Sequence, residues 1–340
     1  MHKKNFKYFF VIIALIILIF LAFYLHIING MFDISVIEVF QTLFNLNDNE
    51  KFRLVVFEFR LPRIVTAILI GIGLSVSGLF LQGITKNELA DPGILGINSG
   101  AGAAVIIYMY FINFKASASD GSNILSIFGM PIFGFIGGLL AALIILIFSN
   151  NNKKMDMQRL ILTGIAVNGG FSAISMLFSM KMNASDFEFA AVWQAGSIYN
   201  ANWTFIYMML PWIIVLSLYL YKKVHLLDYF QLEESSIVSL GIDLDKEKRK
   251  LLFACVGLIS SCVCVAGNIG FIGLMAPHIA RQLVGIKHRK LMPVTALVGV
   301  FLLILSDFIA KTVFAPSELA VGIVISIIGI PYFIYLLYKS

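Results

Sequence analysis

Residues 60–92, which read RLPRIVTAILIGIGLSVSGLFLQGITKNELADP, decide the fold of this chain. About twenty apolar residues, enough to cross the hydrocarbon core of a bilayer as a helix, separate Arg60 and Arg63 from a polar turn that ends at Pro92. Irregular backbone at the edge of a membrane survives only where protein buries it or water fills a cavity. The stretch therefore predicts a membrane helix whose far end borders a path through the membrane.

The composition extends this prediction to the whole chain. Apolar residues make up 59% of the 340 residues and charged residues 13%, against roughly 25% charged in an average soluble domain. The mean hydropathy is +0.92. We expect an all-α, polytopic membrane protein forming a single transmembrane domain over residues 1–340, without a large soluble domain. The ten expected spans lie near residues 6–28, 61–83, 93–113, 126–149, 157–180, 203–222, 250–266, 269–286, 291–311 and 319–338. The first span is expected to stay uncleaved, because no A-x-A-like site follows it.

The positive charges predict the orientation. With both termini inside, 18 of the 25 Lys and Arg residues fall in inner segments and seven in outer ones. This bias satisfies the positive-inside rule and supports an even number of spans. It also accounts for the net charge of +6, so nucleic acid need not be invoked. Arg60 and Arg63 run against the trend, since they lie outside at the start of a helix.

Two connecting segments stand out. In the inner segment from Lys222 to Lys250, apolar residues at 226, 227, 230, 237, 238 and 240 interrupt polar ones, and Gly241 ends the pattern as a helix C-cap would. This predicts a short amphipathic helix on the membrane face, and the pattern fits docking to a partner as well as packing against its own bundle. In the outer segment, Trp193 and Trp203 are typical of an interfacial aromatic belt.

Catalytic and metal-binding patterns are absent from the sequence. It contains no G-x-x-x-x-G-K-[ST], H-E-x-x-H or G-x-S-x-G, and its five histidines show no metal-ligand spacing. Cys255, Cys262 and Cys264 share one span without a C-x-x-C pair. The spans hold few ionisable residues, of which Asp307 is the main carboxylate. A membrane enzyme or an ion-coupled secondary transporter would need such groups, so both alternatives are disfavoured.

From about residue 55 to the C-terminus, the chain resembles the FecCD-type permeases. The resemblance rests on several segments in the expected order, namely RLPR at 60–63, Gln82, NELADPGILGINSGA at 87–101, GFIGLMAPHIAR at 270–281 and ELAVG at 318–322. These permeases are the membrane subunits of type II ABC importers. The resemblance implies that fold, no cofactor and no enzymatic activity in this subunit. It also implies transport of a ferric siderophore, with cobalamin or haem as the alternative within the family.

The resemblance also implies roles for particular residues. Arg60, Arg63 and Lys311 would pair with glutamates of an extracytoplasmic substrate-binding protein, although cations at helix ends also snorkel to headgroups. Segment 228–243 would form coupling helices against an ABC ATPase dimer. The expected ATPase contacts are Glu233, Glu234, Ser239, Leu240 and Gly241, and the expected gate and path residues are Gln82, Asn87, Leu89 and Asn168.

Three positions depart from the family pattern. Lys311 stands where an arginine is usual, which keeps the charge but loses the bidentate fork, while Glu88 and Ala320 each stand where a proline is usual. The remaining expectations are a second permease, identical or related, and a multi-pass location in the cell membrane with both termini cytoplasmic.

Overall fold

A computed structural model describes the chain apart from residues 1, 30–34, 45, 47–48, 112–123, 152–153, 156, 233–236, 238–240, 316 and 340. The described chain is almost entirely helical, as predicted, apart from one pair of two-residue strands. In chain order the elements are α1 (His2–Ile28), α2 (Val36–Leu43), α3 (Glu50–Leu54), the π-helix η1 (Val55–Arg60), α4 (Leu61–Thr85), the 3₁₀ turn η2 (Pro92–Leu95), α5 (Ile97–Phe111), α7 (Ile124–Ser149), β1 (Asn150–Asn151), β2 (Lys154–Met155), α8 (Met157–Ser179), α9 (Ala184–Gln194), α10 (Trp203–Lys223), α11 (His225–Tyr229), α13 (Leu244–Ala266), α14 (Ile272–Val284), α15 (His288–Thr312) and α16 (Val321–Lys339).

Each of the ten predicted spans coincides with a helix. Among the described residues, eight helices are long and apolar enough to cross a membrane. The spans predicted at 93–113 and 269–286 are instead the 15-residue α5 and the 13-residue α14. Both are short because an irregular turn takes up the start of the span. The turn before α5 is η2, and the turn before α14 contains Gly267 and Phe271, both of which have a positive φ.

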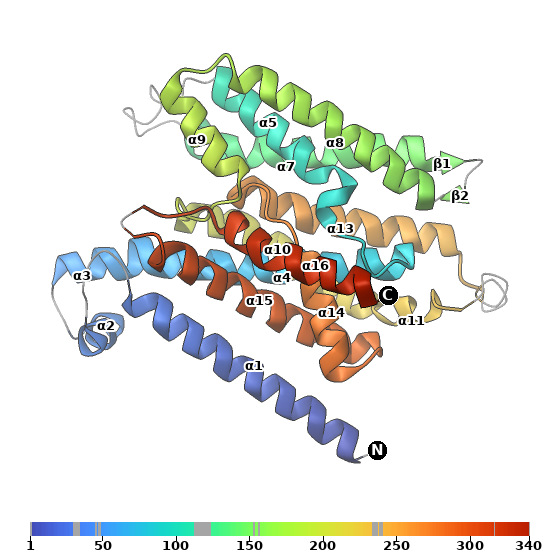
Figure 1. The fold of residues 1–340 in the computed structure, drawn as a ribbon, viewed down its shortest axis with the longest axis horizontal. Helices are drawn as coiled ribbons and strands as arrows, with labels where there is room; N and C mark the ends of the chain where they lie inside the picture. Colours follow the sequence, from blue (N-terminus) through green and yellow to red (C-terminus); the bar gives the residue numbers. More distant parts are fainter. Residues whose placement is uncertain are drawn as a thin grey trace.

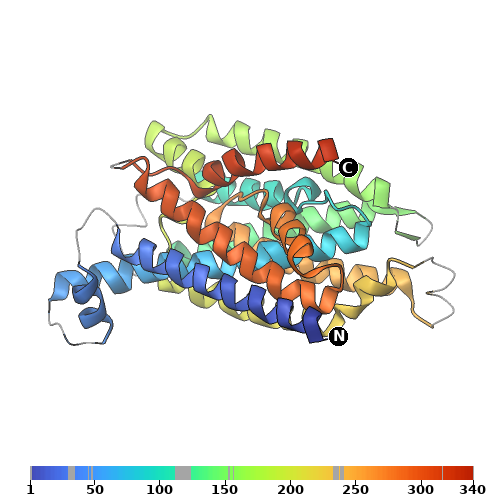
Figure 2. The same cartoon turned by 60° about the horizontal axis from the view of Figure 1, so that its bottom comes forward.

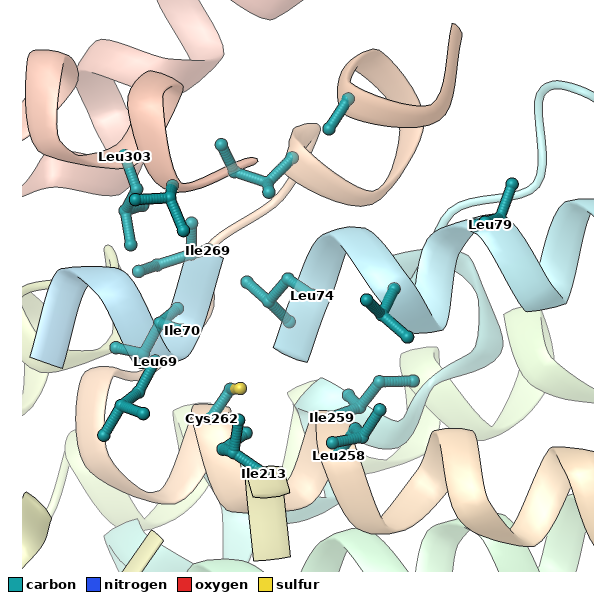
Figure 3. Close-up of a cluster of buried hydrophobic side chains, with 14 of the residues drawn as sticks. Leu69, Ile70, Leu74, Leu79, Ile213, Leu258, Ile259, Cys262, Ile269 and Leu303 are labelled. Atoms are coloured by element: carbon teal, nitrogen blue, oxygen red, sulfur yellow. The ribbon is translucent and has the colours of Figure 1, made fainter. Parts of the chain in front are cut away.

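Helices α4 and α13 form the centre of the bundle (Figure 1), and most of their residues are buried. Helices α5, α7 and α8 lie on one side of this pair, and α14, α15 and α1 on the other, with α1 packed on α15. Figure 3 shows where the central helices meet. The side chains labelled there come from α4 (Leu69, Ile70, Leu74, Leu79), α13 (Leu258, Ile259, Cys262), α10 (Ile213), α15 (Leu303) and the turn before α14 (Ile269).

Glycines let α4 approach its neighbours closely. A Cβ atom on Gly78 would lie 2.0 Å from the carbonyl oxygen of Gly273 in α14, and one on Gly71 would lie 2.7 Å from the Cα atom of Val300 in α15. Such contacts matter inside a membrane, where lipid is as apolar as the helices and association depends on tight packing.

The two ends of the chain lie at the same end of the bundle, together with α11 and the β1–β2 hairpin, while α2 and α3 lie at the opposite end (Figures 1 and 2). An even number of crossings produces this arrangement. At the opposite end, α2 begins with a capping box, in which the Ser35 hydroxyl accepts from the backbone N–H of Glu38 and the Glu38 carboxylate accepts from that of Ser35.

Candidate functional site

Arg63 occupies the centre of a buried ionic cluster at the end of the bundle that holds α2 and α3. Its guanidinium binds Asp307 through two contacts, Nε to Oδ2 at 2.7 Å and Nη2 to Oδ1 at 2.8 Å, and binds the Glu318 Oε2 atom through Nη1 at 2.6 Å. The Nε2 atom of His26 lies 2.6 Å from Asp307 Oδ2. Only 8% of Arg63 and 1% of Asp307 is exposed. The cluster thus joins α1, α4, α15 and the segment before α16.

Arg60 lies beside this cluster and is also engaged within the chain. It is 4% exposed, and its Nη1 atom donates to the carbonyl oxygens of Ile27 and Ile28 at the C-terminal end of α1, where a helix leaves carbonyls without partners. Lys311 is half-buried. Arg60, Arg63 and Lys311 line one recess of about 490 Å³ together with Glu58 and Glu318. The structure therefore brings the three predicted docking cations together, with both arginines already paired.

The opposite end of α4 holds the predicted gate turn. Gln82 is 3% exposed, and its side chain accepts from Arg281 Nη2 at 3.2 Å and donates to the carbonyl oxygen of Gly273 at 3.4 Å. Glu88 reaches the same arginine, with its Oε1 atom 3.2 Å from Arg281 Nη1. The charge that departs from the family pattern therefore has a partner, which ties the turn to α14.

Within this turn, side chains support the backbone. The Asn87 Oδ1 atom accepts from the backbone N–H of Leu89 at 2.9 Å. Asp91 caps η2 by accepting from the N–H of Gly93 at 2.8 Å, while its other carboxylate oxygen is buried without a hydrogen-bond partner. Burial raises the pKa of Asp91 to about 6, because the charged form loses its hydration.

The predicted amphipathic segment buries its apolar face in the protein's own bundle. Leu226, Leu227, Phe230 and Ile237 are all buried, which confirms the packing interpretation for that face. Gly241 is exposed and left-handed, with a φ of 73°. The other four predicted ATPase contacts lie outside the described residues, and they are Glu233, Glu234, Ser239 and Leu240.

Three contacts connect this segment to the transmembrane helices. A Cβ atom on Gly83 of α4 would lie 2.9 Å from a methyl group of Leu227. The Asp228 Oδ1 atom lies 2.7 Å from the Nδ1 atom of His288, at the start of α15. The Lys86 Nζ atom donates to the carbonyl oxygen of Leu232 at 3.3 Å. A displacement of the segment would therefore move the end of α4 that leads into the predicted gate turn.

Asn168 does not belong to the gate turn. It lies on α8, in a polar pocket of about 130 Å³ that also contains Gly93, Asn98 and Trp193. Trp193 is 5% exposed, so its predicted place in an interfacial belt is wrong, because α9 folds this side chain against α5. Trp203 instead donates its indole N–H to the carbonyl oxygen of Phe57.

Sequence reasoning missed several partners in these clusters. Asp307 stood out as the main carboxylate of the spans, but nothing in the sequence linked it to Arg63, which lies 244 residues away. His26 was not singled out, because it lies in an apolar span without a patterned neighbour. A lone carboxylate and a lone histidine in two membrane spans were the available hint, because such groups usually pair with each other.

The bundle of long apolar helices, with its two half-length helices and its polar turn, is the architecture of a polytopic membrane protein. A sequence profile of the FecCD transport family matches residues 14–339. The iron-uptake system permease protein FeuC of Bacillus subtilis is 45% identical over 325 residues, covering 96% of each chain. The iron(3+)-hydroxamate import system permease protein FhuG of the same organism is also 45% identical, over the full length of both chains.

A solved structure agrees with these sequence relatives. It is described as an inward-facing conformation of a metal-chelate type ABC transporter, and it superposes with a TM-score of 0.82 at 27% identity, covering 96% of this chain and 98% of the other. The chain belongs to the FecCD transport family. It is therefore a membrane-embedded permease subunit of an ABC importer, a transport subunit that works with a separate ATPase and a substrate-binding protein.

Proposed function

We propose that this permease moves a ferric siderophore across the cytoplasmic membrane. The supporting observation is the 45% identity that extends over nearly the whole chain to two permeases whose names specify iron uptake and iron(3+)-hydroxamate import. The chelate passes unmodified, and the energy comes from ATP hydrolysed by the ATPase subunits. Within the proposal, the end of the bundle that holds Arg63 faces outward and both termini are cytoplasmic, in keeping with the bias of the positive charges.

The outer recess is the proposed docking site for the binding protein. Arg60, Arg63 and Lys311 offer three cations around one hollow, and carboxylates on the binding protein would pair with them. Since Arg63 already binds Asp307 and Glu318, an incoming carboxylate would join or replace Glu318, which is the more exposed of the two. Among the described residues Lys311 forms no ion pair with the carboxylates of the cluster. It is only half-buried, and we assign it the more direct part in docking.

Segment 228–243 is the proposed ATPase contact, with Glu233, Glu234, Ser239, Leu240 and Gly241 facing the ATPase subunit. Closure of the ATPase dimer on ATP would push this segment as a rigid body. The Gly83–Leu227 and Asp228–His288 contacts would carry that motion to α4 and α15. Gln82, Asn87 and Leu89 would then respond as gate residues, while Asn168 would line the path beyond them.

Two permease chains, identical or related, would enclose this path. In the single chain α8 is mostly exposed, and it carries Asn168 and Ser172 on its exposed surface. Polar groups of this kind in a membrane helix face a partner or a water-filled cavity rather than lipid. A second permease beside α8 supplies both.

Uptake of radiolabelled iron tests the proposal. A strain lacking this chain would be offered a panel of ferric siderophores, with haem and cobalamin as comparators, and the gene would be restored as the control. We expect one siderophore class to be lost and restored. Loss of haem or cobalamin uptake instead would identify that compound as the substrate, in place of a ferric siderophore. Dependence on the proton gradient at constant ATP would point to an ion-coupled transporter.

A further inference from the structure

Helices α7 and α10 border a groove at the end of the bundle that holds the docking recess. Each of them packs against α13, but they share few contacts with each other in the part of the chain that the structure describes. Two hollows of about 560 Å³ and about 200 Å³ lie between them. Val265 of α13 lines both hollows, and Met130 of the larger one precedes Pro131 of the smaller one on α7. The hollows therefore form one groove with α13 as its floor.

The polarity of the lining changes along the groove. The larger hollow, next to α9 and the segment before α10, contains all but one of the described polar lining groups apart from the cysteine, namely Ser185, Glu188, Trp193, Ser197, Tyr199, Asn200 and Asn202. The walls of the smaller hollow are formed by Pro131, Ile132, Phe135, Ile136, Met208, Met209 and Trp212. The groove is thus mixed at one end and apolar at the other.

The floor of the smaller hollow also presents little polarity. The Ser261 hydroxyl donates to the carbonyl oxygen of Leu258 at 2.8 Å, and the Cys264 thiol donates to the carbonyl oxygen of Ser261 at 3.2 Å. Both donors are used within α13, so they do not require a polar ligand. This end of the groove suits a hydrocarbon group.

The groove is about as deep as one leaflet. From Asn202, the N-cap of α10, to Trp212 is ten residues, or about 15 Å at 1.5 Å per residue. The hydrocarbon core of a bilayer is roughly 30 Å thick, so this length is about half of it. The rings of Trp212 and Phe135 have centroids 4.9 Å apart and lie at the apolar end. A molecule with its polar part by Asn202 and its apolar part by Trp212 would match the leaflet on that side.

The size of the smaller hollow favours a lipid chain over a protein helix. An α-helix with its side chains is about 10 Å across, so a space of about 200 Å³ would hold less than one turn of it. A hydrocarbon chain is a single file of methylene groups and can lie along α13 between the two walls. Since hydrocarbon gains little from leaving the surrounding lipid, specific binding requires the polar end.

The charge at the polar end indicates the headgroup. Glu188 of α9 is the only charged side chain among the described residues that line the two hollows, and it is exposed. An ammonium group would pair with this carboxylate, whereas a headgroup of net negative charge would be repelled. Ser197 and Asn200 provide hydroxyl and amide donors for the phosphate of the same headgroup.

We propose that the groove between α7 and α10 binds one phospholipid with an ammonium headgroup, which pairs with Glu188 while an acyl chain lies over α13. Tyr199, Asn200 and Asn202 line both this groove and the docking recess. The bound lipid therefore supports the segment that separates the two. The proposal concerns the lipid around the permease and does not depend on which chelate is transported.

Native mass spectrometry of the delipidated permease–ATPase complex in detergent tests the headgroup. The probes are phosphatidylethanolamine, which has an ammonium group, and phosphatidylglycerol with the same acyl chains, which is anionic. We expect phosphatidylethanolamine to bind about fivefold more tightly, the effect of a single exposed ion pair. Glu188→Gln should remove this preference. Glu50→Gln, at an exposed position of α3 outside the groove, should retain it.

A second pair of variants tests the acyl-chain site. Met208→Trp enlarges a side chain that lines the smaller hollow and should weaken binding of both lipids about tenfold. Leu218→Trp adds the same side chain at a position of α10 that is 57% exposed and outside the groove, and binding should be unchanged. The Tm of each complex shows that it is folded.

Three outcomes would overturn the proposal. They are equal binding of the two lipids by the unchanged complex, a preference that persists in Glu188→Gln, and equal lipid binding by folded Met208→Trp and Leu218→Trp complexes. If Met208→Trp does not assemble, Glu188→Gln still decides, because it alters an exposed position.

Discussion

Arg63 shows how the environment of one residue changes what its sequence motif means. Its motif predicts an outward cation, yet the side chain is buried and its guanidinium is shared between Asp307 and Glu318. Burying charges is costly, and the cost is offset only when the ions pair with good geometry. Arg63 and Asp307 meet this condition through two parallel hydrogen bonds. We therefore regard Asp307 as the residue that positions Arg63.

Removing the charge of Asp307 tests this role. We expect Asp307→Asn to lower the free energy of unfolding by about 3 kcal/mol, because loss of one partner leaves the arginine buried with incomplete compensation. The Tm of the purified complex in detergent measures the effect. Glu318→Gln is the matched control, with a smaller expected loss because the Glu318 side chain is 17% exposed. An Asp307→Asn complex as stable as the unchanged one would contradict the assignment.

Lys311 allows docking to be tested without breaking the buried pair. We expect Lys311→Glu to weaken binding of the substrate-binding protein by about tenfold, since a like charge would face the incoming carboxylates, and to leave the Tm nearly unchanged. Binding measured at several salt concentrations checks this, with Lys51→Glu as a control for charge at an exposed position outside the recess. Equal effects of the two substitutions would show that general charge, not the recess, governs binding.

At the scale of elements, the crossing of α4 and α14 depends on two glycines. A side chain on Gly78 would meet the backbone of Gly273, and one on Gly273 would meet Pro92 of η2 at 2.4 Å. The irregular turn before α5 and the half-length helix α14 thus lie against the same stretch of α4. Backbone cannot yield as a flexible side chain does, so the contact constrains both turns.

We expect Gly78→Ala to destabilise the permease by about 1–3 kcal/mol through overpacking. Gly169→Ala in α8 is the matched control, because the added methyl group meets nothing within 4 Å, and alanine stabilises a helix relative to glycine. Thermal unfolding of both variants gives the comparison. If Gly78→Ala unfolds at the same temperature as Gly169→Ala, the close approach of the two helices is not as described.

The cap of η2 predicts a pH dependence. The pKa of Asp91 is raised to about 6 by burial, so the folded protein holds this proton more tightly than the unfolded chain does. The contribution of Asp91 to stability therefore declines as the pH rises from about 4 to about 6 and stays low above that range. We expect Asp91→Asn, which keeps an acceptor for Gly93, to remove this decline and to raise the Tm at pH 7. If the Tm of the unchanged protein and the Tm of Asp91→Asn vary with pH in parallel, the prediction is refuted.

At the scale of the molecule, the outer helices lack a full set of packing partners within this chain. Only a minority of the residues in α1, α8, α10 and α16 are buried, whereas α4 and α13 are mostly buried. Lipid suits an apolar surface, but the polar face of α8 needs protein or water beside it. We expect the complex purified with its ATPase to contain two permease chains, and native mass spectrometry measures the stoichiometry. A complex with one permease chain would contradict the proposed path between two chains.

The sequence by itself determined the helical class, the places of the ten helices and the family, because runs of apolar residues and several ordered motifs are local features. It also marked Arg63, Lys311, Gln82 and Asn168 as candidates. Only the tertiary structure decided that α5 and α14 are half-length and that Arg63 is paired internally. It alone showed that Asn168 shares a pocket with Asn98 and Trp193. These outcomes depend on contacts between residues far apart in the chain. Hydrophobic periodicity is a local pattern and does not specify such contacts.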